Sequence, residues 1–163
     1  MSFSKKPVIV VSRCLGFGVC RWNGEVLDCC LVDELKNEVD FIPVCPECEL
    51  GLGLPRPPIL LVQKNSALTL MQPATGLDLT SRMVTFAEKF LQSLSQVDGF
   101  LLKRKSPSCG LAGIPIYDTL DAEFPLNKNG TGFFAQAVHR FFPDTPKVDE
   151  ECSGKESFLE LFK

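Results

Sequence analysis

Short apolar runs, separated by turns rich in glycine, proline and polar residues, set the pattern of this chain. The runs at 7–13, 41–44, 59–62, 99–103 and 146–148 each have the length of a buried strand. The first run is apolar except for its last two residues. A strand that is covered on both faces of a sheet has this pattern. We therefore predict a strand at each of these positions.

Apolar residues recur at helical spacing in the segments between these runs. We predict the longest helix over 77–96, where the recurring positions are Leu79, Met83, Phe86, Phe90 and Leu94. Shorter helices are predicted over 31–39, 132–142 and 156–162, and Pro143 ends the second of these. Strands and helices thus alternate along the chain.

Alternation of strands with helices predicts the fold class. It favours an α/β fold: a three-layer sandwich with a mostly parallel sheet and helices on both faces. The composition, 45% hydrophobic and 23% charged over 163 residues, suits one globular domain with a proper core. We find no repeat, linker or low-complexity tract, so residues 1–163 are predicted to form a single domain.

The charge balance limits the possible partners. The net charge is −3 and the pI about 5.2, so no general basic field attracts nucleic acid to this chain. The dense basic run is Lys103, Arg104 and Lys105. It has two open interpretations, a solvated loop or a local contact with a phosphate group.

The first apolar run is far too short for a signal peptide or a membrane span, so we expect a cytoplasmic protein with no membrane partner. The chain has eight cysteines. In a reducing compartment, that number argues against a framework of disulfides and leaves metal binding or catalysis as the usual roles.

Three cysteines follow predicted strands directly. Cys14 comes after VIVV, Cys45 after FIPV and Cys109 after GFLLK and a short polar loop. The carboxyl ends of strands in an open α/β sheet border one crevice, so these thiols can meet there. Three thiolates at one point most often bind a metal ion or an iron–sulfur cluster.

Two further cysteines lie near these positions. Cys20 is six residues beyond Cys14, and Cys48 forms a CxxC motif with Cys45, a spacing that suits zinc, clusters or redox dithiols. The single histidine, His139, lies in a helical stripe and is interpreted as a core or surface residue. The other cysteines are interpreted as small buried hydrophobic residues or surface thiols: Cys29, Cys30 and Cys152.

The residues alone leave several kinds of site open. Structural zinc and an iron–sulfur cluster compete almost evenly, and a redox dithiol built on Cys45 and Cys48 is a third possibility. Ligands that come singly from three strand ends are more typical of a catalytic cluster in a crevice. In that case Glu47, two residues beyond Cys45, and the serines beside Cys109 would be placed for proton transfer.

The sequence around these positions resembles the TudS-type thiouracil desulfidases, in particular the branch whose longer members carry an additional C-terminal domain. The likeness extends from about Val8 to the end of the chain. The motifs that carry it are Cys14-Leu-Gly with Cys20-Arg21, Pro43-Val-Cys45-Pro-Glu47, Gly53-Leu-Pro-Arg56-Pro-Pro, Gly76-x-Asp78-x-Thr80 and Lys103-x-x-Ser106-Pro-Ser108-Cys109-Gly110.

The resemblance implies a 4Fe–4S cluster with three protein ligands and one open iron. The ligands would be Cys14, Cys45 and Cys109. It implies that Glu47 is the general base or acid and that Ser106 assists proton transfer or holds the substrate. We expect Ser108 and Lys103 to contact the substrate. Cys48 stands where many members have an aliphatic residue, so it is a possible fourth thiolate that would close the open iron.

The activity implied is the non-redox desulfuration of a thiolated uracil to its oxo form, with release of sulfide. The substrate would be 2-thiouracil, 4-thiouridine, its monophosphate, or thiouridine in tRNA, although the net charge does not indicate tRNA as a partner. The alternative is a non-catalytic binding domain that is stabilised by zinc or a cluster.

Overall fold

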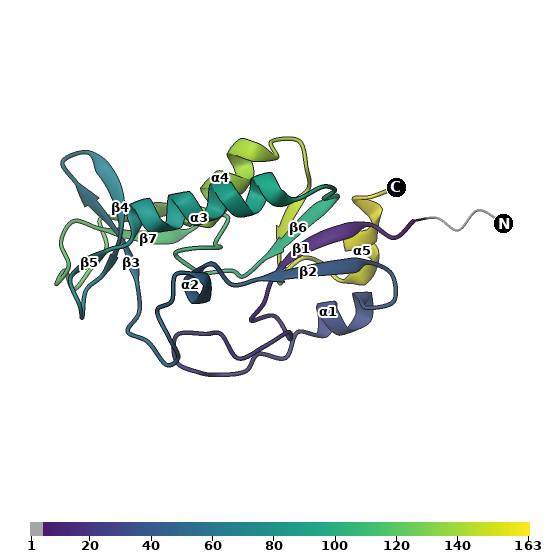
Figure 1. Ribbon diagram of the computed structural model, residues 1–163, viewed down its shortest axis with the longest axis horizontal. Helices are drawn as coiled ribbons and strands as arrows, with labels where there is room; N and C mark the ends of the chain where they lie inside the picture. The colour runs from purple at the N-terminus through teal and green to yellow at the C-terminus, as the bar shows by residue number, and fades with distance from the viewer. Residues whose placement is uncertain (1–4) are drawn as a thin grey trace.

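Figure 1 shows the computed structural model, which describes residues 5–163. Its first sheet has four strands that all run parallel. Their order across the sheet is β2 (Asp40–Val44), β1 (Val8–Ser12), β6 (Gly99–Leu102) and β9 (Lys147–Asp149). The central strands β1 and β6 are almost wholly buried, which explains their continuous apolar sequence.

One face of this sheet is covered by α3 (Thr80–Ser93) and α4 (Phe133–Phe141), which pack against each other (Figure 1). Val10 of β1 and Phe100 of β6 belong to the core on this side, together with apolar residues of both helices. The predicted stripe of α3 faces this core, because Leu79 at its start and Met83 within it are fully buried.

The opposite face is covered by α1 (Cys30–Leu35) and α5 (Lys155–Glu160) (Figure 1). A second core cluster joins Ile9 and Val11 of β1 to Phe158 of α5 and to the apolar residues of α1. Successive side chains of a strand point to opposite faces, so Val10 lies in one core and its two neighbours in the other. The predicted α/β class, with a parallel sheet between two helical layers, is confirmed.

A second sheet, not anticipated from the sequence, lies beside the first (Figure 1). Only its β3–β7 pair is parallel, and its other pairs are antiparallel. Its strand order is β5 (Leu77–Asp78), β4 (Ala67–Gln72), β3 (Leu60–Lys64), β7 (Ile114–Tyr117) and β8 (Asn127–Gly130). The run predicted at 59–62 therefore belongs to this mixed sheet.

Local geometry explains two of the differences from the sequence prediction. Asn65 and Ser66 both have positive φ, 47° and 67°, which is the geometry of a tight two-residue hairpin turn between β3 and β4. The long helix begins at Thr80 and not at residue 77, because β5 pairs with β4. The Asp78 carboxylate then accepts the backbone N–H of Thr80 at 3.0 Å.

The helices are short. The longest, α3, has 14 residues, and no helix within residues 5–163 is both long and apolar enough to cross a membrane.

Candidate functional site

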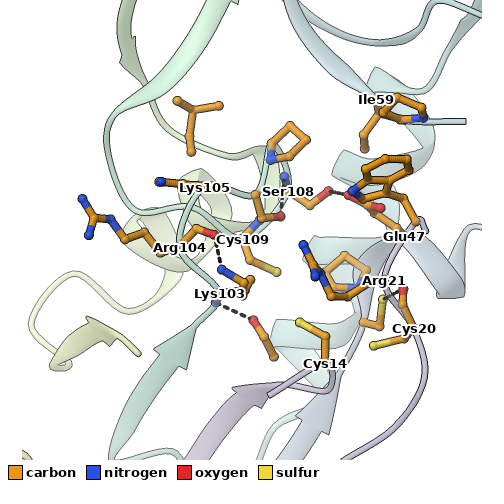
Figure 2. Close-up of a pocket in the computed structure, with 18 of the residues that line it drawn as sticks. Cys14, Cys20, Arg21, Glu47, Ile59, Lys103, Arg104, Lys105, Ser108 and Cys109 are labelled. Atoms are coloured by element: carbon orange, nitrogen blue, oxygen red, sulfur yellow. Dashed lines mark hydrogen bonds between the residues drawn. The ribbon is translucent and has the colours of Figure 1, made fainter. Parts of the chain in front are cut away.

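The carboxyl ends of β1, β2 and β6 border a pocket of about 380 Å³. Cys14, Cys45 and Cys109 all line it, so the three cysteines that the sequence singled out do converge. In Figure 2 the sulfur atoms of Cys14 and Cys109 point into the same space. Cys45 and Cys109 are buried, and Cys14 is partly exposed.

The turn after β2 places two functional groups close to each other. Cys45 is the N-cap of a short helix, α2 (Pro46–Glu49), whose first position is Pro46. Proline suits that position because its fixed φ fits a helix and no N–H is needed there. The strand therefore passes directly into a helical turn, and both Cys45 and Glu47 line the pocket.

The loop that carries Cys109 is held by its own serine. The Ser106 hydroxyl oxygen accepts the backbone N–H of Ser108 at 3.2 Å and that of Cys109 at 2.9 Å. The loop is also joined to β1, because the backbone N–H of Lys103 donates to the Ser12 hydroxyl at 2.8 Å. These bonds fix the direction of the Cys109 side chain.

The start of α4 supports the same loop from behind. The N–H of Phe133 donates to the carbonyl of Pro107 at 3.1 Å, and the N–H of Ala135 to that of Ser108 at 3.1 Å. A Cβ at Gly132 would lie 2.4 Å from the Ser108 carbonyl oxygen. Only glycine permits this close approach of the two backbones.

Glu47 lies between an arginine and a serine. Its Oε2 accepts Nε of Arg56 at 3.0 Å and Nη2 of Arg56 at 2.6 Å, while its Oε1 accepts the Ser108 hydroxyl at 3.0 Å. The Ser108 side chain is fully buried and Arg56 is 5% exposed. Figure 2 shows Glu47 and Ser108 joined across the pocket.

The structure brings Cys20 and Cys48 into the same group of thiols. The carbonyl of Cys20 accepts weak hydrogen bonds from Sγ of Cys45, at 3.8 Å, and from Sγ of Cys48, at 3.6 Å. The Cys20 thiol itself contacts the thiols of Cys14 and Cys45. The sequence left the place of both residues open, since nothing local shows that the loop after Cys14 folds back over β2.

The environment of Cys45 and Cys109 raises the pKa of both thiols and favours their neutral form while no metal is bound. Burial raises the pKa of Cys109 to about 12, although hydrogen bonds from Ser12 and Ser106 oppose the change. The hydrogen bond with Cys20, followed by burial, raises the pKa of Cys45 strongly. Buried thiols of this kind become thiolates when a bound metal displaces their protons.

The thiols do not form a site for one ion. Within residues 5–163, no group of three or more histidine, cysteine or acidic side chains is arranged to hold a single metal ion. The cysteines of a 4Fe–4S cluster bind different irons, so they stand farther apart than the ligands of one ion.

The basic run borders the pocket, and two of its three charges have partners. The Lys103 ammonium bonds to the Glu150 carboxylate and, at 2.8 Å, to the Arg104 carbonyl. Arg104 forms an ion pair with Glu151. All three residues line the pocket. Lys105 is exposed and forms none of the ion pairs found within residues 5–163, so the solvated loop and the phosphate contact both stay open for it.

Several lining residues were not found by sequence reasoning. Arg56 entered only as part of a motif, and Arg13, Arg21 and Trp22 were given no role, yet all four line the pocket. Burial of Arg56 beside Glu47, which lies in the preceding helix α2, has no local sequence signal. The indole of Trp22, 45% exposed, lies at the edge of the site.

Known proteins are similar to this chain in sequence and in fold. A sequence model of the 2-thiouracil desulfurase family matches residues 9–150. Among solved structures, the chain is similar to the 4Fe–4S-dependent thiouracil desulfidase TudS, with a TM-score of 0.70 and 27% identity over 96% of this chain and 98% of that chain. The uncharacterized protein YbbK of Bacillus subtilis (strain 168) is 31% identical over 110 residues, 63% of this chain and 73% of that protein.

The family match includes β1, β2, β6 and the loops that carry Cys14, Cys45 and Cys109, and the structural match extends over nearly the whole chain. The fold, the pocket at the strand ends and both comparisons therefore agree: this chain belongs to the 2-thiouracil desulfurase family.

Proposed function

We propose that this chain is an iron–sulfur-dependent desulfidase that replaces the sulfur of a thiolated uracil by oxygen. One thiocarbonyl and one water give one carbonyl and one hydrogen sulfide, so the reaction needs no oxidant or reductant. The observation that best supports this proposal is the convergence of three thiols and the hydrogen-bonded pair of Glu47 and Ser108 in a single pocket.

Cys14, Cys45 and Cys109 are the residues that would hold a 4Fe–4S cluster. Their chemistry fits that group, because thiolate sulfur is the usual ligand of iron–sulfur centres and all three thiols line the same pocket. When bound with one iron left open, the cluster supplies a soft acceptor for the thiocarbonyl sulfur, which makes the attached carbon more electrophilic.

Glu47 would then act as the general base. Its Oε1 would take a proton from the attacking water and later return it to the departing sulfur. The hydroxyl of Ser108, which donates to Oε1, holds that oxygen in place on the pocket wall.

Ser106 and Lys103 would contact the substrate side of the pocket. The Ser106 oxygen already accepts two backbone N–H groups, and its hydroxyl is directed to the Cys109 thiol, so a bound substrate would compete with that thiol for the hydroxyl proton. The Lys103 ammonium is shared with Glu150, so it would contribute a polar contact at the rim and not an isolated charge.

The size and lining of the pocket suit a small planar substrate. A volume of about 380 Å³ lies in the usual range for small-molecule sites. Its apolar wall would receive the faces of a pyrimidine ring and exclude bulk water other than the attacking molecule. This wall includes Ile59, Leu61, Ile114 and Pro115.

Anaerobic reconstitution followed by a sulfide-release assay tests the proposal. The full chain is loaded with iron and sulfide, and the substrates are 2-thiouracil, 4-thiouridine, its monophosphate and thiolated tRNA. We expect a brown protein that releases sulfide and forms the oxo product from at least one of them without added reductant. A colourless zinc protein, or a cluster-loaded protein inactive on all four, would contradict the proposal.

A further inference from the structure

The side chain of Arg56 contacts four different residues of the site wall. It is almost completely buried, with 2% of its side chain exposed, and its main ion-pair partner Glu47 has 13% exposed. Arg56 lies between Pro55 and Pro57, in the loop that leads from α2 to β3. Proline on both sides restricts the backbone of this loop, so the backbone conformation is well fixed at the residue that carries the guanidinium.

All five N–H groups of the guanidinium are used. Nε and Nη2 donate to Oε2 of Glu47, Nη2 also donates to the Cys20 carbonyl at 2.8 Å, and Nη1 donates to the Gly53 carbonyl at 3.1 Å and to Sγ of Cys48 at 3.7 Å. An arginine has five such donors in a fixed planar arrangement, whereas a lysine has three on a flexible stem. Only arginine can make this set of contacts.

The two oxygens of the Glu47 carboxylate have different hydrogen-bond partners. Arg56 holds Oε2 with two hydrogen bonds, and Ser108 on the opposite wall donates to Oε1. The carboxylate cannot rotate without losing bonds at both ends. Oε1 is therefore the oxygen left to serve the pocket, in a fixed direction.

Stability alone is a poor explanation for such a buried ion pair. Taking two charges out of water costs much of what their attraction returns, and apolar residues of similar size often serve as well. A guanidinium that is fully hydrogen-bonded to the glutamate proposed as the base has a clearer use in directing that group.

We propose that Arg56 is the positioning residue for Glu47: it fixes Oε2 so that Oε1 faces the reacting carbon of the bound substrate. The proposal rests on the proposed function, because it gives Arg56 a part in that reaction. Arg56 itself does not touch the substrate in this role and acts only through Glu47.

The test compares Arg56→Ala and Arg56→Lys with the wild-type protein, all cluster-loaded. A carboxylate displaced by about 1 Å loses roughly 100-fold in turnover. We therefore expect kcat to fall by roughly this factor in Arg56→Ala while KM changes much less and the iron content and visible absorbance stay at the wild-type level. Added guanidinium should restore part of the kcat of Arg56→Ala. Arg56→Lys should have a kcat well below that of the wild type even though it keeps the charge, because lysine has three N–H donors in place of the five of arginine.

A matched control and a double variant complete the experiment. Arg140→Ala removes an exposed arginine whose partner is Glu88, far from the pocket in the fold, and should leave kcat unchanged. In a Glu47→Gln background, Arg56→Lys should cause little further loss, since both changes then act on one group. Additive losses, or a wild-type kcat in folded Arg56→Ala, would overturn the proposal.

The outcomes also separate the two proposals. Loss of iron together with activity in every Arg56 variant would show that Arg56 supports the cluster loops, which overturns the positioning role. A loaded wild-type protein that releases no sulfide contradicts the proposed function itself. An active wild type with unaffected Arg56 variants contradicts only the role given to Arg56.

Discussion

Ser108 donates its hydroxyl proton to Glu47 Oε1 at 3.0 Å, although the two residues are 61 positions apart in the sequence. Ser108 comes from the loop after β6, and Glu47 lies in the helix after β2. The bond joins two walls of the pocket that flank β1, the central strand that ends just before Cys14. The site is thus closed by side chains from loops that do not follow each other in the chain.

The two serines of this loop should respond differently to alanine substitution. Ser108→Ala removes the donor to Glu47, so we expect a clear loss of kcat with a nearly unchanged melting temperature. Ser106→Ala leaves two backbone N–H groups without their acceptor, which costs about 1–3 kcal/mol when such groups are buried. Its melting temperature should therefore fall. The difference between the two serines is measured by thermal unfolding and sulfide release on both variants. A Ser106→Ala protein that melts like the wild type but does not turn over would contradict this expectation and would indicate that Ser106 acts in the reaction itself.

Loss of any proposed ligand should remove the cluster. Cys14→Ala, Cys45→Ala and Cys109→Ala each leave two thiols in the ligand set, which we expect to be too few to retain a 4Fe–4S centre. The matched control is Cys30→Ala, because Cys30 is exposed on α1 and away from the pocket. Iron and acid-labile sulfide are measured on each reconstituted protein. A full cluster in Cys109→Ala would refute the ligand assignment.

Replacement of Glu47 by glutamine keeps the shape of the side chain and removes the base. We expect turnover to fall by roughly 100- to 10,000-fold, the usual contribution of a general acid–base group. The cluster absorbance should persist, because Glu47 is not a proposed ligand. The variant also leaves the buried Arg56 without an anionic partner, so its melting temperature should drop. Unchanged turnover would move the base elsewhere.

Cys48 gives a direct test of how many thiolates hold the cluster. Its thiol donates to the Cys20 carbonyl and accepts from Arg56, so it already has two partners in the wall of the site. We expect Cys48→Ala to keep both its cluster and most of its sulfide release. An inactive protein without iron would instead indicate a four-thiolate structural site, and a faster enzyme would indicate that Cys48 occupies the open iron. Iron content and sulfide release on anaerobic protein distinguish these outcomes.

The sequence was most informative where the structure of a segment follows from its own pattern of apolar residues. The run before Cys14 is apolar on both faces, so it predicts a central strand. A cysteine that follows such a strand lies at the carboxyl end of the sheet. The same reasoning placed Cys109 after the buried strand β6. Cys45 also follows a strand as predicted, but β2 is an edge strand with only Val44 buried, so the expectation of a buried strand was wrong there. The proline after Cys45 is the first residue of α2, a helical turn that the sequence analysis did not predict.

What the sequence did not predict depends on contacts between distant segments. Strand β8 has the sequence NKNG, which has little strand propensity, and it forms because β7 lies beside it. Arg56 and Cys20 are likewise brought to the site by the path of long loops. A buried arginine cannot be told from an exposed arginine in a sequence. The five hydrogen bonds of Arg56 could therefore be found only from the fold.

Under the proposed function, the two sheets contribute different parts of the site. The thiols and Glu47 follow strands of the parallel sheet, whereas Leu60, Ile114 and Tyr117 in the opposite wall belong to the mixed sheet. Substitutions of Leu60 or Tyr117 would therefore change the room for a ring substituent from the wall opposite the thiols. Ile114 differs, because its side chain packs against Gly110, next to Cys109. The same parallel sheet could thus keep one reaction while changes in the mixed sheet adapt the pocket to different thiolated rings, if the proposed roles are assigned as above.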